Sequence, residues 1–234
     1  VIEQRLTIVV GGLERAGAIA NIAGETNDVI DCLVAIDSGM GRIGYRIETP
    51  FENELAKTEI EEMDELDGIR IIGMISHFST SDEADSSYTD KQLSLFNDFY
   101  EELAGCGISL PMLSIANSAA IMDYPRTHFD AVRPGIIMYG CYPSDEVDKS
   151  RLDLEPVMSV KAYIVHLKTV PAGTAISYGR RFITERESKI ATISIGYADG
   201  YARTLTGKAE VLVNGHRVPV VGSICMDQCM VDIG

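Results

Sequence analysis

Long hydrophobic runs and an excess of basic side chains are both missing from this sequence. Its 234 residues are 46% hydrophobic, yet no uninterrupted apolar run approaches the ~18–20 residues that a membrane-spanning helix needs. The chain has 20 Lys and Arg against 35 Asp and Glu, a formal net charge of −15. Because nucleic acids and anionic membranes bind through Lys and Arg, we expect no nucleic-acid and no membrane partner, and any anion site must be a local basic pocket.

Metal-ligand spacing is absent as well. The four histidines show no ligand spacing, and Cys225 and Cys229, four residues apart, have no second Cys or His pair nearby. We therefore expect no metal, and reduced, buried thiols typical of a cytoplasmic protein; no signal peptide is visible. The sequence opens with Val1 and closes directly after a strand-like run, so we expect part of a longer protein that lacks both ends.

Apolar runs alternate with amphipathic stretches through the first 141 residues. Strands are predicted at 6–10, 29–36, 69–78, 112–116 and 132–140, and helices at 13–23, 51–66 and 90–103. Repeated βα units of this kind indicate a parallel sheet, either a (β/α)₈ barrel or a doubly wound sheet. About four units are too few for a whole barrel, which fits a barrel without its N-terminal piece.

The pattern changes near residue 142. The segment 142–153 is polar and is predicted to be a linker. Strands then follow closely at 160–169, 189–195, 209–213 and 217–221. Asn214-Gly215 lies between the last two and predicts a tight hairpin, because both central residues of a type I′ turn need positive φ. Residues 154–234 are therefore predicted to form an antiparallel β domain, so that the fold class is α/β plus β.

Polar residues follow two of the predicted parallel strands, where barrel enzymes place active-site groups. Asp37-Ser-Gly-Met-Gly-Arg-Ile-Gly44 brings Arg42 to the end of one strand, and His77 ends the next. Each has a plainer explanation: a tight turn with a solvated arginine, and a structural or merely exposed histidine.

Two further segments predict an anion pocket. Ser118 follows Asn117 and begins a short helix whose N-terminus and hydroxyl could hold an anion, although an ordinary helix cap explains the pair equally well. Arg133 is predicted on the last barrel-like strand, where a buried charge needs a partner. Gly135 would let backbone N–H groups approach a phosphate closely.

In this order and spacing the motifs resemble those of the alanine racemases, which use pyridoxal 5′-phosphate (PLP). The matching stretches are Asp37-Ser-Gly-Met-Gly-Arg-Ile-Gly44, Ser76-His-Phe78, Ala116-Asn-Ser-Ala119, Val132-Arg-Pro-Gly-Ile136, Met138-Tyr-Gly140, Ser177-Tyr-Gly179, Gly196-Tyr-Ala-Asp-Gly200 and Val220-Val-Gly to Cys225-Met-Asp227. The resemblance implies that residues 1–141 are the C-terminal part of a PLP-binding (β/α)₈ TIM-type barrel, followed by the β domain at 154–234. It also implies an amino-acid substrate and a cytoplasmic homodimer whose subunits share their active sites.

The resemblance assigns roles to individual residues. Tyr178 matches the tyrosine that acts as acid/base toward the L-enantiomer, with Arg42 and His77 in the polar network around it and the substrate. A free tyrosine has a pKa of ~10, so a base near neutral pH needs cationic donors, and Arg and His are suitable. The plainer explanation of Tyr178 is an amphipathic residue at a strand end.

Cofactor and substrate contacts are implied in the same way. Arg133 matches the arginine that hydrogen-bonds the pyridine nitrogen of PLP, and Ser118 with the backbone of Gly135 and Ile136 matches the phosphate cradle. Besides Arg42, Tyr197 and Met226 match substrate contacts, although ordinary β-domain packing explains these two as well.

The sequence departs from the family at two places. The lysine that binds PLP covalently, and is the base for the D-enantiomer, belongs to a Lys-Ala-x-Ala-Tyr-Gly-like motif that is absent here. Ala35 stands where many members have a lysine that helps hold the neighbouring arginine. We therefore expect the chain alone to be inactive.

The implied activity is PLP-dependent interconversion of L- and D-alanine by two-base proton transfer, which supplies D-alanine for peptidoglycan. A serine or broad-specificity racemase would share every PLP contact, because one extra hydroxyl is hard for a small pocket to reject. A non-catalytic, truncated barrel paralogue is the remaining alternative, and the missing lysine supports it.

Overall fold

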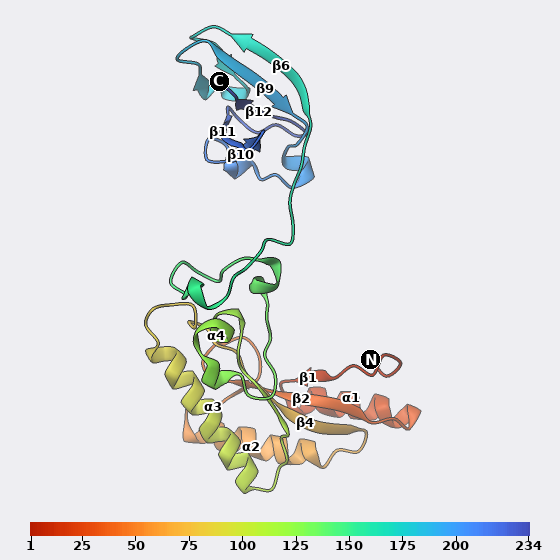
Figure 1. The fold of residues 1–234 in the computed structure, drawn as a ribbon. Helices are drawn as coiled ribbons and strands as arrows, with labels where there is room; N and C mark the ends of the chain where they lie inside the picture. Colours follow the sequence, from red (N-terminus) through yellow and green to blue (C-terminus); the bar gives the residue numbers. More distant parts are fainter. The chain divides into compact units, whose positions relative to one another are not determined.

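Strands and helices alternate through the first part of the chain, as the sequence predicts (Figure 1). The computed structural model describes residues 1–234, which divide into two units, Val1–Met158 and Ser159–Gly234. The predicted helices at 13–23, 51–66 and 90–103 are confirmed, with ends that differ by a few residues. The elements of the first unit are β1 (Ile8–Val10), α1 (Leu13–Thr26), β2 (Ile30–Asp37), β3 (Tyr45–Arg46), α2 (Pro50–Asp64), β4 (Ile69–Ile75), α3 (Ser87–Gly105), β5 (Met112–Ser114) and α4 (Ser118–Asp123), followed by 3₁₀ turns at Pro125–Thr127, Ile136–Tyr139 and Lys149–Arg151.

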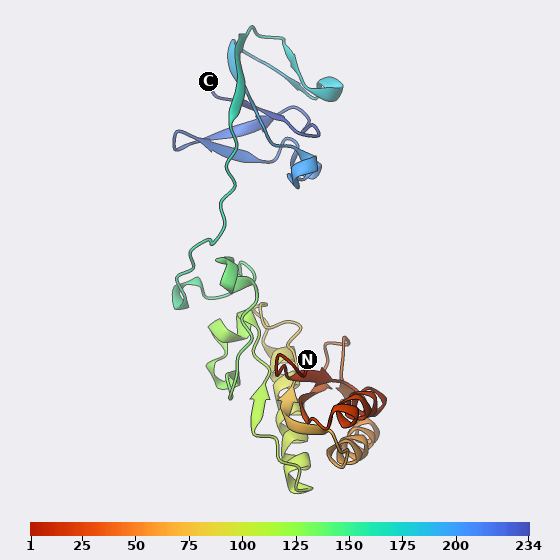
Figure 2. The same ribbon diagram turned by 90° about the vertical axis from the view of Figure 1, so that its right-hand side faces the viewer.

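The strands of the first unit form one parallel sheet. Its order is β1-β2-β4-β5, and the short β3 pairs with the end of β2. Because β1, β2, β4 and β5 lie side by side in chain order, right-handed crossovers put the helices that connect them on one side of the sheet. Figure 2 shows α1 and α2 together on one side of the strands. This arrangement confirms the predicted barrel-type α/β part and sets the carboxyl ends of all strands at one edge.

Local sequence explains where these elements begin and which side they bury. Thr49 caps α2 by accepting from the Glu52 N–H, and the Glu52 carboxylate accepts from the Thr49 N–H in return. Pro50 occupies the first turn, where its missing N–H costs nothing. The inward face of α1 consists of three alanines and Ile19 at helical spacing, and the alanines allow close approach to the sheet. The buried side of α3 carries larger groups such as Phe96.

The strand predicted at 132–140 is wrong. The Arg133 N–H donates to the Ala116 carbonyl beyond β5, but no ladder follows. Pro134 has no N–H to donate, and Gly135 adopts φ −112° and ψ −100°, outside the β region. Ile136–Tyr139 then turn as a 3₁₀ helix.

The segment 142–153, predicted to be a linker, packs on α4. Tyr142, Val147 and Leu154 lie in one cluster with Ala119 and Met122. The two compact units therefore meet later in the chain than the predicted linker, between Met158 and Ser159. The domain limits predicted from the sequence stay a prediction.

The second unit is antiparallel, as expected. Its five-stranded sheet has the order β10-β11-β12-β9-β6, and β7 pairs with β8. The predicted hairpin is confirmed, since Asn214 and Gly215 have φ of 50° and 82° between paired strands. The strands are β6 (Ile164–Val170), β7 (Ala175–Ile176), β8 (Phe182–Ile183), β9 (Ser188–Ile193), β10 (Glu210–Val213), β11 (His216–Val221) and β12 (Cys229–Asp232), with 3₁₀ turns at Tyr178–Arg180, Tyr197–Asp199 and Arg203–Leu205.

The five thiols are free but are not uniformly buried. Cys32 and Cys229 lie in the cores of the two units, and Cys225 is half-buried. The expectation of buried thiols is wrong for Cys106 and Cys141, which are exposed because each follows the end of a helical turn, where the chain leaves the core. No helix combines the length and the apolar character that a membrane crossing requires.

Candidate functional site

The carboxyl edge of the parallel sheet brings together three of the predicted site residues. Arg42 lies in the loop after β2, His77 follows β4, and Arg133 comes from the segment after β5. All three line one small hollow of about 80 Å³, whose walls also include Ala35, Ile36, Asp37, Met40, Ile43, Ile75 and Ser76. Two guanidinium groups and an imidazole thus share a confined space at the edge where barrel enzymes carry their chemistry.

The loop that carries Arg42 is fixed at both ends. At its start, the Asp37 carboxylate accepts from the N–H groups of Gly39, Met40 and Gly41 at 3.0, 2.8 and 3.0 Å. At its end, Gly44 has φ +107°, and a Cβ there would lie 2.5 Å from the Ala35 carbonyl oxygen. Only glycine allows both this backbone angle and this close return of the loop to β2.

Arg133 is held by neutral partners. Its guanidinium donates to the Ser114 hydroxyl and the Ser76 carbonyl, and its Nη2 lies 3.4 Å from His77 Nδ1. The partners of this half-buried charge are therefore not carboxylates. They are the Ser76 carbonyl, just after β4, and the Ser114 hydroxyl at the end of β5. Burial, and the positive charge of Arg42, lower the pKa of Arg133 from its ordinary value.

His77 is neutral at physiological pH. Burial, followed by the positive charges of Arg42 and Arg133, lowers its pKa from 6.5 to about 4. A guanidinium can only donate, so Nδ1 accepts from Arg133 and the ring proton resides on Nε2. His77 is thus a neutral N–H donor, which differs from the cationic donor that the sequence suggested.

Ser118 and Gly135 meet as predicted. The Gly135 N–H donates to Ser118 Oγ at 2.8 Å, which leaves the hydroxyl proton of Ser118 free for another acceptor. Asn117 caps α4 through the Ala120 N–H at 3.1 Å, so both the capping explanation and the pocket explanation describe this segment. A hollow of about 290 Å³ opens here, lined by His77, Asp82, Asn117, Ser118, Ala119, Arg133, Gly135, Ile136 and Pro143.

Tyr178 begins a 3₁₀ turn of the second unit, where hydrogen bonds hold its backbone while its ring is exposed. The Ser177 hydroxyl donates to the Ser223 carbonyl at 2.6 Å, and the Ser223 hydroxyl donates to the Tyr178 carbonyl at 2.8 Å. Ser177 itself has φ +65°, a left-handed value that these contacts maintain. The Tyr178 side chain is 72% exposed, so its phenol is presented to whatever lies outside this unit.

Tyr197 and Met226 lie on two segments that are joined by backbone hydrogen bonds. The Tyr197 N–H donates to the Cys225 carbonyl at 3.0 Å, and the following N–H donates to the Met226 carbonyl at 2.8 Å. Their side chains are 43% and 59% exposed. The plainer explanation, packing inside the β domain, therefore does not describe these two side chains.

Sequence reasoning missed the polar residues of α3. Tyr88 donates to the Gly39 carbonyl at 2.8 Å, and Gln92, fully buried, donates to the His77 carbonyl at 3.1 Å. The Gln92 side-chain oxygen also accepts from the N–H and the hydroxyl of Ser79. A signal was present: Gln92 interrupts an apolar stripe that continues through Phe96, and a buried amide requires partners.

Comparisons with known proteins agree with this picture. The family model "Alanine racemase, N-terminal domain" matches residues 1–143, and "Alanine racemase, C-terminal domain" matches residues 157–234. The chain is 51% identical over 221 residues to the alanine racemase of Clostridium novyi (strain NT), a match that covers 94% of this chain and 56% of that protein.

Two solved structures are similar over nearly the whole chain. Alanine racemase from Clostridium difficile 630 superposes with a TM-score of 0.89 at 42% identity, covering 99% of this chain and 59% of that one. Alanine racemase from Bacillus anthracis, solved with bound L-Ala-P, superposes with a TM-score of 0.86 at 36% identity, covering 99% of this chain and 58% of that one. The chain therefore spans less than three-fifths of the length of these relatives.

Proposed function

The chain belongs to the alanine racemase family, and from that membership we propose that the complete protein interconverts L- and D-alanine with PLP. The observation that carries the proposal is the convergence of Arg42, His77 and Arg133 at one sheet edge, beside the Ser118–Gly135 pair. We extend it to a cytoplasmic homodimer with active sites shared between subunits, making D-alanine for peptidoglycan. The exposed phenol of Tyr178 supports the sharing, since it is presented outward from its own unit.

The donors at the sheet edge fit PLP. The free hydroxyl proton of Ser118 suits a phosphate oxygen, and the backbone at Gly135 and Ile136 lines the same hollow. Arg133 also faces this hollow, where its guanidinium can donate to a pyridine nitrogen. When bound, PLP supplies the electron sink that makes the Cα proton of an amino acid removable.

Arg133 controls how strong that sink is. Guanidinium keeps its proton even with a lowered pKa, so it donates a hydrogen bond and leaves the pyridine nitrogen unprotonated. A less electron-deficient ring favours simple proton exchange over transamination. The Ser114 hydroxyl and the Ser76 carbonyl fix the direction of the guanidinium.

Tyr178 is proposed as the acid/base toward L-alanine. Arg42 supplies the permanent charge that lowers the cost of a phenolate, and His77 adds a neutral donor through Nε2–H. Arg42 is also proposed to bind the substrate carboxylate, with Tyr197 and Met226 as further substrate contacts. The L-Ala-P bound by the Bacillus anthracis relative supports an alanine-like ligand.

The second base of the family is a lysine, and none of the seven lysines of this chain lines either hollow. The second candidate is a non-catalytic paralogue. The two candidates differ in one measurement on the complete protein with PLP: exchange of the alanine α-proton with solvent deuterium.

We expect the complete protein to incorporate deuterium at Cα of both L- and D-alanine and to produce the opposite enantiomer from each. L-Serine in the same assay ranks the substrates by kcat/KM. Preference for serine would change the substrate assignment, and absence of exchange with every amino acid tested would establish the non-catalytic candidate.

A further inference from the structure

Arg42 is positioned without a side-chain partner. Ala35, which stands where the resemblance implies a lysine in many family members, is almost fully buried and has no polar side chain to offer. The Arg42 side chain makes no hydrogen bond and no ion pair within the chain, and it shares its hollow with the positive charge of Arg133 and with Asp37. Its placement therefore depends on the backbone of the loop that carries it.

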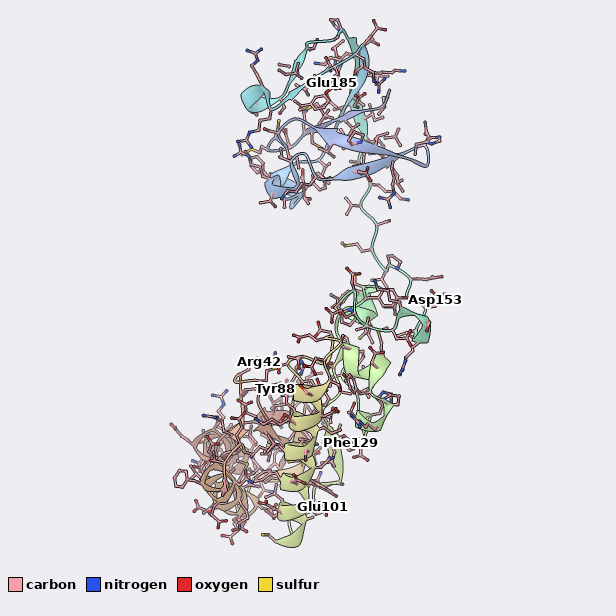
Figure 3. All side chains as sticks on the ribbon, turned by 90° about the vertical axis from the view of Figure 1, so that its left-hand side faces the viewer. Arg42, Tyr88, Glu101, Phe129, Asp153 and Glu185 are labelled. Carbon is pink, nitrogen blue, oxygen red and sulfur yellow. The ribbon has the colours of Figure 1, made fainter.

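The middle of that loop is held from α3. The Tyr88 hydroxyl donates to the Gly39 carbonyl at 2.8 Å, three residues before Arg42. A second observation makes the contact specific: a Cβ on Gly39 would lie 2.6 Å from the Tyr88 hydroxyl oxygen, so the glycine is needed for the tyrosine to reach the carbonyl. Figure 3 labels both side chains and shows Arg42 and Tyr88 at the end where α3 begins.

Other contacts fix the start of the loop and the helix that holds its middle. The Ser38 and Ser76 hydroxyls lie 2.9 Å apart in a buried contact, which ties the loop to the segment next to His77. Four residues after Tyr88, Gln92 donates to the His77 carbonyl from the same face of α3. One helix face thus fixes the loops of both Arg42 and His77.

We propose that Tyr88 is a positioning residue for Arg42, which acts by holding the Gly39 carbonyl and, through it, the backbone of the loop that carries Arg42. The inference rests on the proposed function, because Arg42 matters only if it binds substrate and stabilises the Tyr178 phenolate. Tyr88 itself contacts neither.

The test is Tyr88→Phe in the complete protein, with Tyr100→Phe as the matched control. Tyr100 lies on the same helix 12 residues later, ~18 Å along its axis, and its hydroxyl donates to no group of the chain. The first measurement is backbone amide hydrogen exchange across residues 38–44, which does not depend on catalysis. We expect several-fold faster exchange in Tyr88→Phe and no change in Tyr100→Phe.

The second measurement is the pH profile of kcat/KM for alanine. A loosened Arg42 stabilises the phenolate less, so we expect kcat/KM to fall about fivefold to tenfold and the acid limb to move to higher pH. A variant that is only less stable would keep the position of the acid limb. The double variant Gly39→Ala/Tyr88→Phe should be no worse than Gly39→Ala alone, because both changes break one contact.

Unchanged exchange in Tyr88→Phe overturns the proposal, and so does faster exchange with an unmoved pH profile. If the complete protein with native sequence shows no racemisation, the proposed function fails and the positioning role fails with it. The exchange rates would still show in that case whether Tyr88 anchors the loop, so the two failures can be told apart.

Discussion

The two units hold their candidate residues in opposite ways. In the first unit the candidate side chains other than Arg42 are fixed: Arg133 donates to Ser114 and Ser76 and lies beside His77, and the Gly135 N–H donates to the Ser118 hydroxyl. In the second unit the backbone is fixed and the side chain is exposed: the Tyr178 carbonyl accepts a hydrogen bond from the Ser223 hydroxyl, while the Tyr178 ring is exposed.

This difference corresponds to two kinds of task. Groups that bind a cofactor of fixed shape benefit from side chains that are already oriented, because no ordering cost remains at binding. A group that moves a proton needs a well-placed main chain and a ring that can reach its target. This difference fits the proposed function, in which the first unit binds the cofactor and Tyr178 of the second unit acts as the acid/base.

Removal of the Tyr178 hydroxyl is the change with the largest expected effect. We expect Tyr178→Phe in the complete protein to lower kcat by roughly 10²–10⁴-fold, the usual contribution of a general acid/base. The free energy of unfolding should stay within ~0.5 kcal/mol, because the ring is exposed. Steady-state kinetics and urea unfolding measure the two. A loss in kcat below tenfold would contradict the role of the presented phenol.

Gly44→Ala should disturb the fixed unit most strongly. The new Cβ would meet the Ala35 carbonyl at 2.5 Å in a backbone with φ +107°, so we expect a loss of roughly 2–4 kcal/mol in the free energy of unfolding. Gly41→Ala is the matched control in the same loop, since its φ is +71° and nothing lies within 4 Å of the added Cβ. It should cost about 1 kcal/mol. Equal urea midpoints would show that the loop does not close tightly on β2.

Ser118→Ala tests whether the hydroxyl is a phosphate donor. We expect PLP affinity of the complete protein to fall roughly tenfold or more, the value of one hydrogen bond to a charged group. Ser94→Ala removes an exposed hydroxyl from α3 that contacts only Asp98, and it should leave PLP affinity unchanged. Titration followed by absorbance measures both. Identical dissociation constants would leave the Ser118 hydroxyl only its structural contact with the Gly135 N–H.

The sequence predicts most of this structure because the relevant signals are local. Apolar periodicity places α1, α2 and α3 and the four parallel strands, and Asn214-Gly215 places the hairpin. The strand at 132–140 fails because its apolar residues satisfy the pattern, while Pro134 and the backbone of Gly135 prevent the ladder.

The site is only partly readable from sequence. The residues at strand ends are predictable, since parallel strands end at one edge, but the partners of Arg133 are a carbonyl and a hydroxyl that carry no sequence signature. The neutral state of His77 arises from burial and from two arginines distant in sequence. Tyr88 and Gln92 become functional candidates only once α3 is known to cross both loops.

The smallest effect concerns the charge state of His77. Its pKa is about 4 in the folded protein, because burial and then the charges of Arg42 and Arg133 disfavour the protonated ring. Between pH 6.5 and 4 the unfolded chain binds a proton that the folded protein does not. The free energy of unfolding gained from a neutral His77 is therefore complete above pH ~6.5 and is lost as the pH falls toward 4. Since the ring is only half-buried, we expect ~1–2 kcal/mol rather than the full shift.

His77→Asn separates this contribution from other acid effects. The variant cannot bind the extra proton, so its free energy of unfolding should fall by ~1 kcal/mol less than that of the native protein between pH 7 and pH 4.5. His216→Asn, on the exposed hairpin of the second unit, should keep the full native pH dependence. Guanidinium unfolding at the two pH values supplies the comparison. If both variants lose the same free energy of unfolding on acidification, His77 is not held neutral in the folded protein. The surroundings of the candidate residues in the first unit would then not differ electrostatically from those in the second.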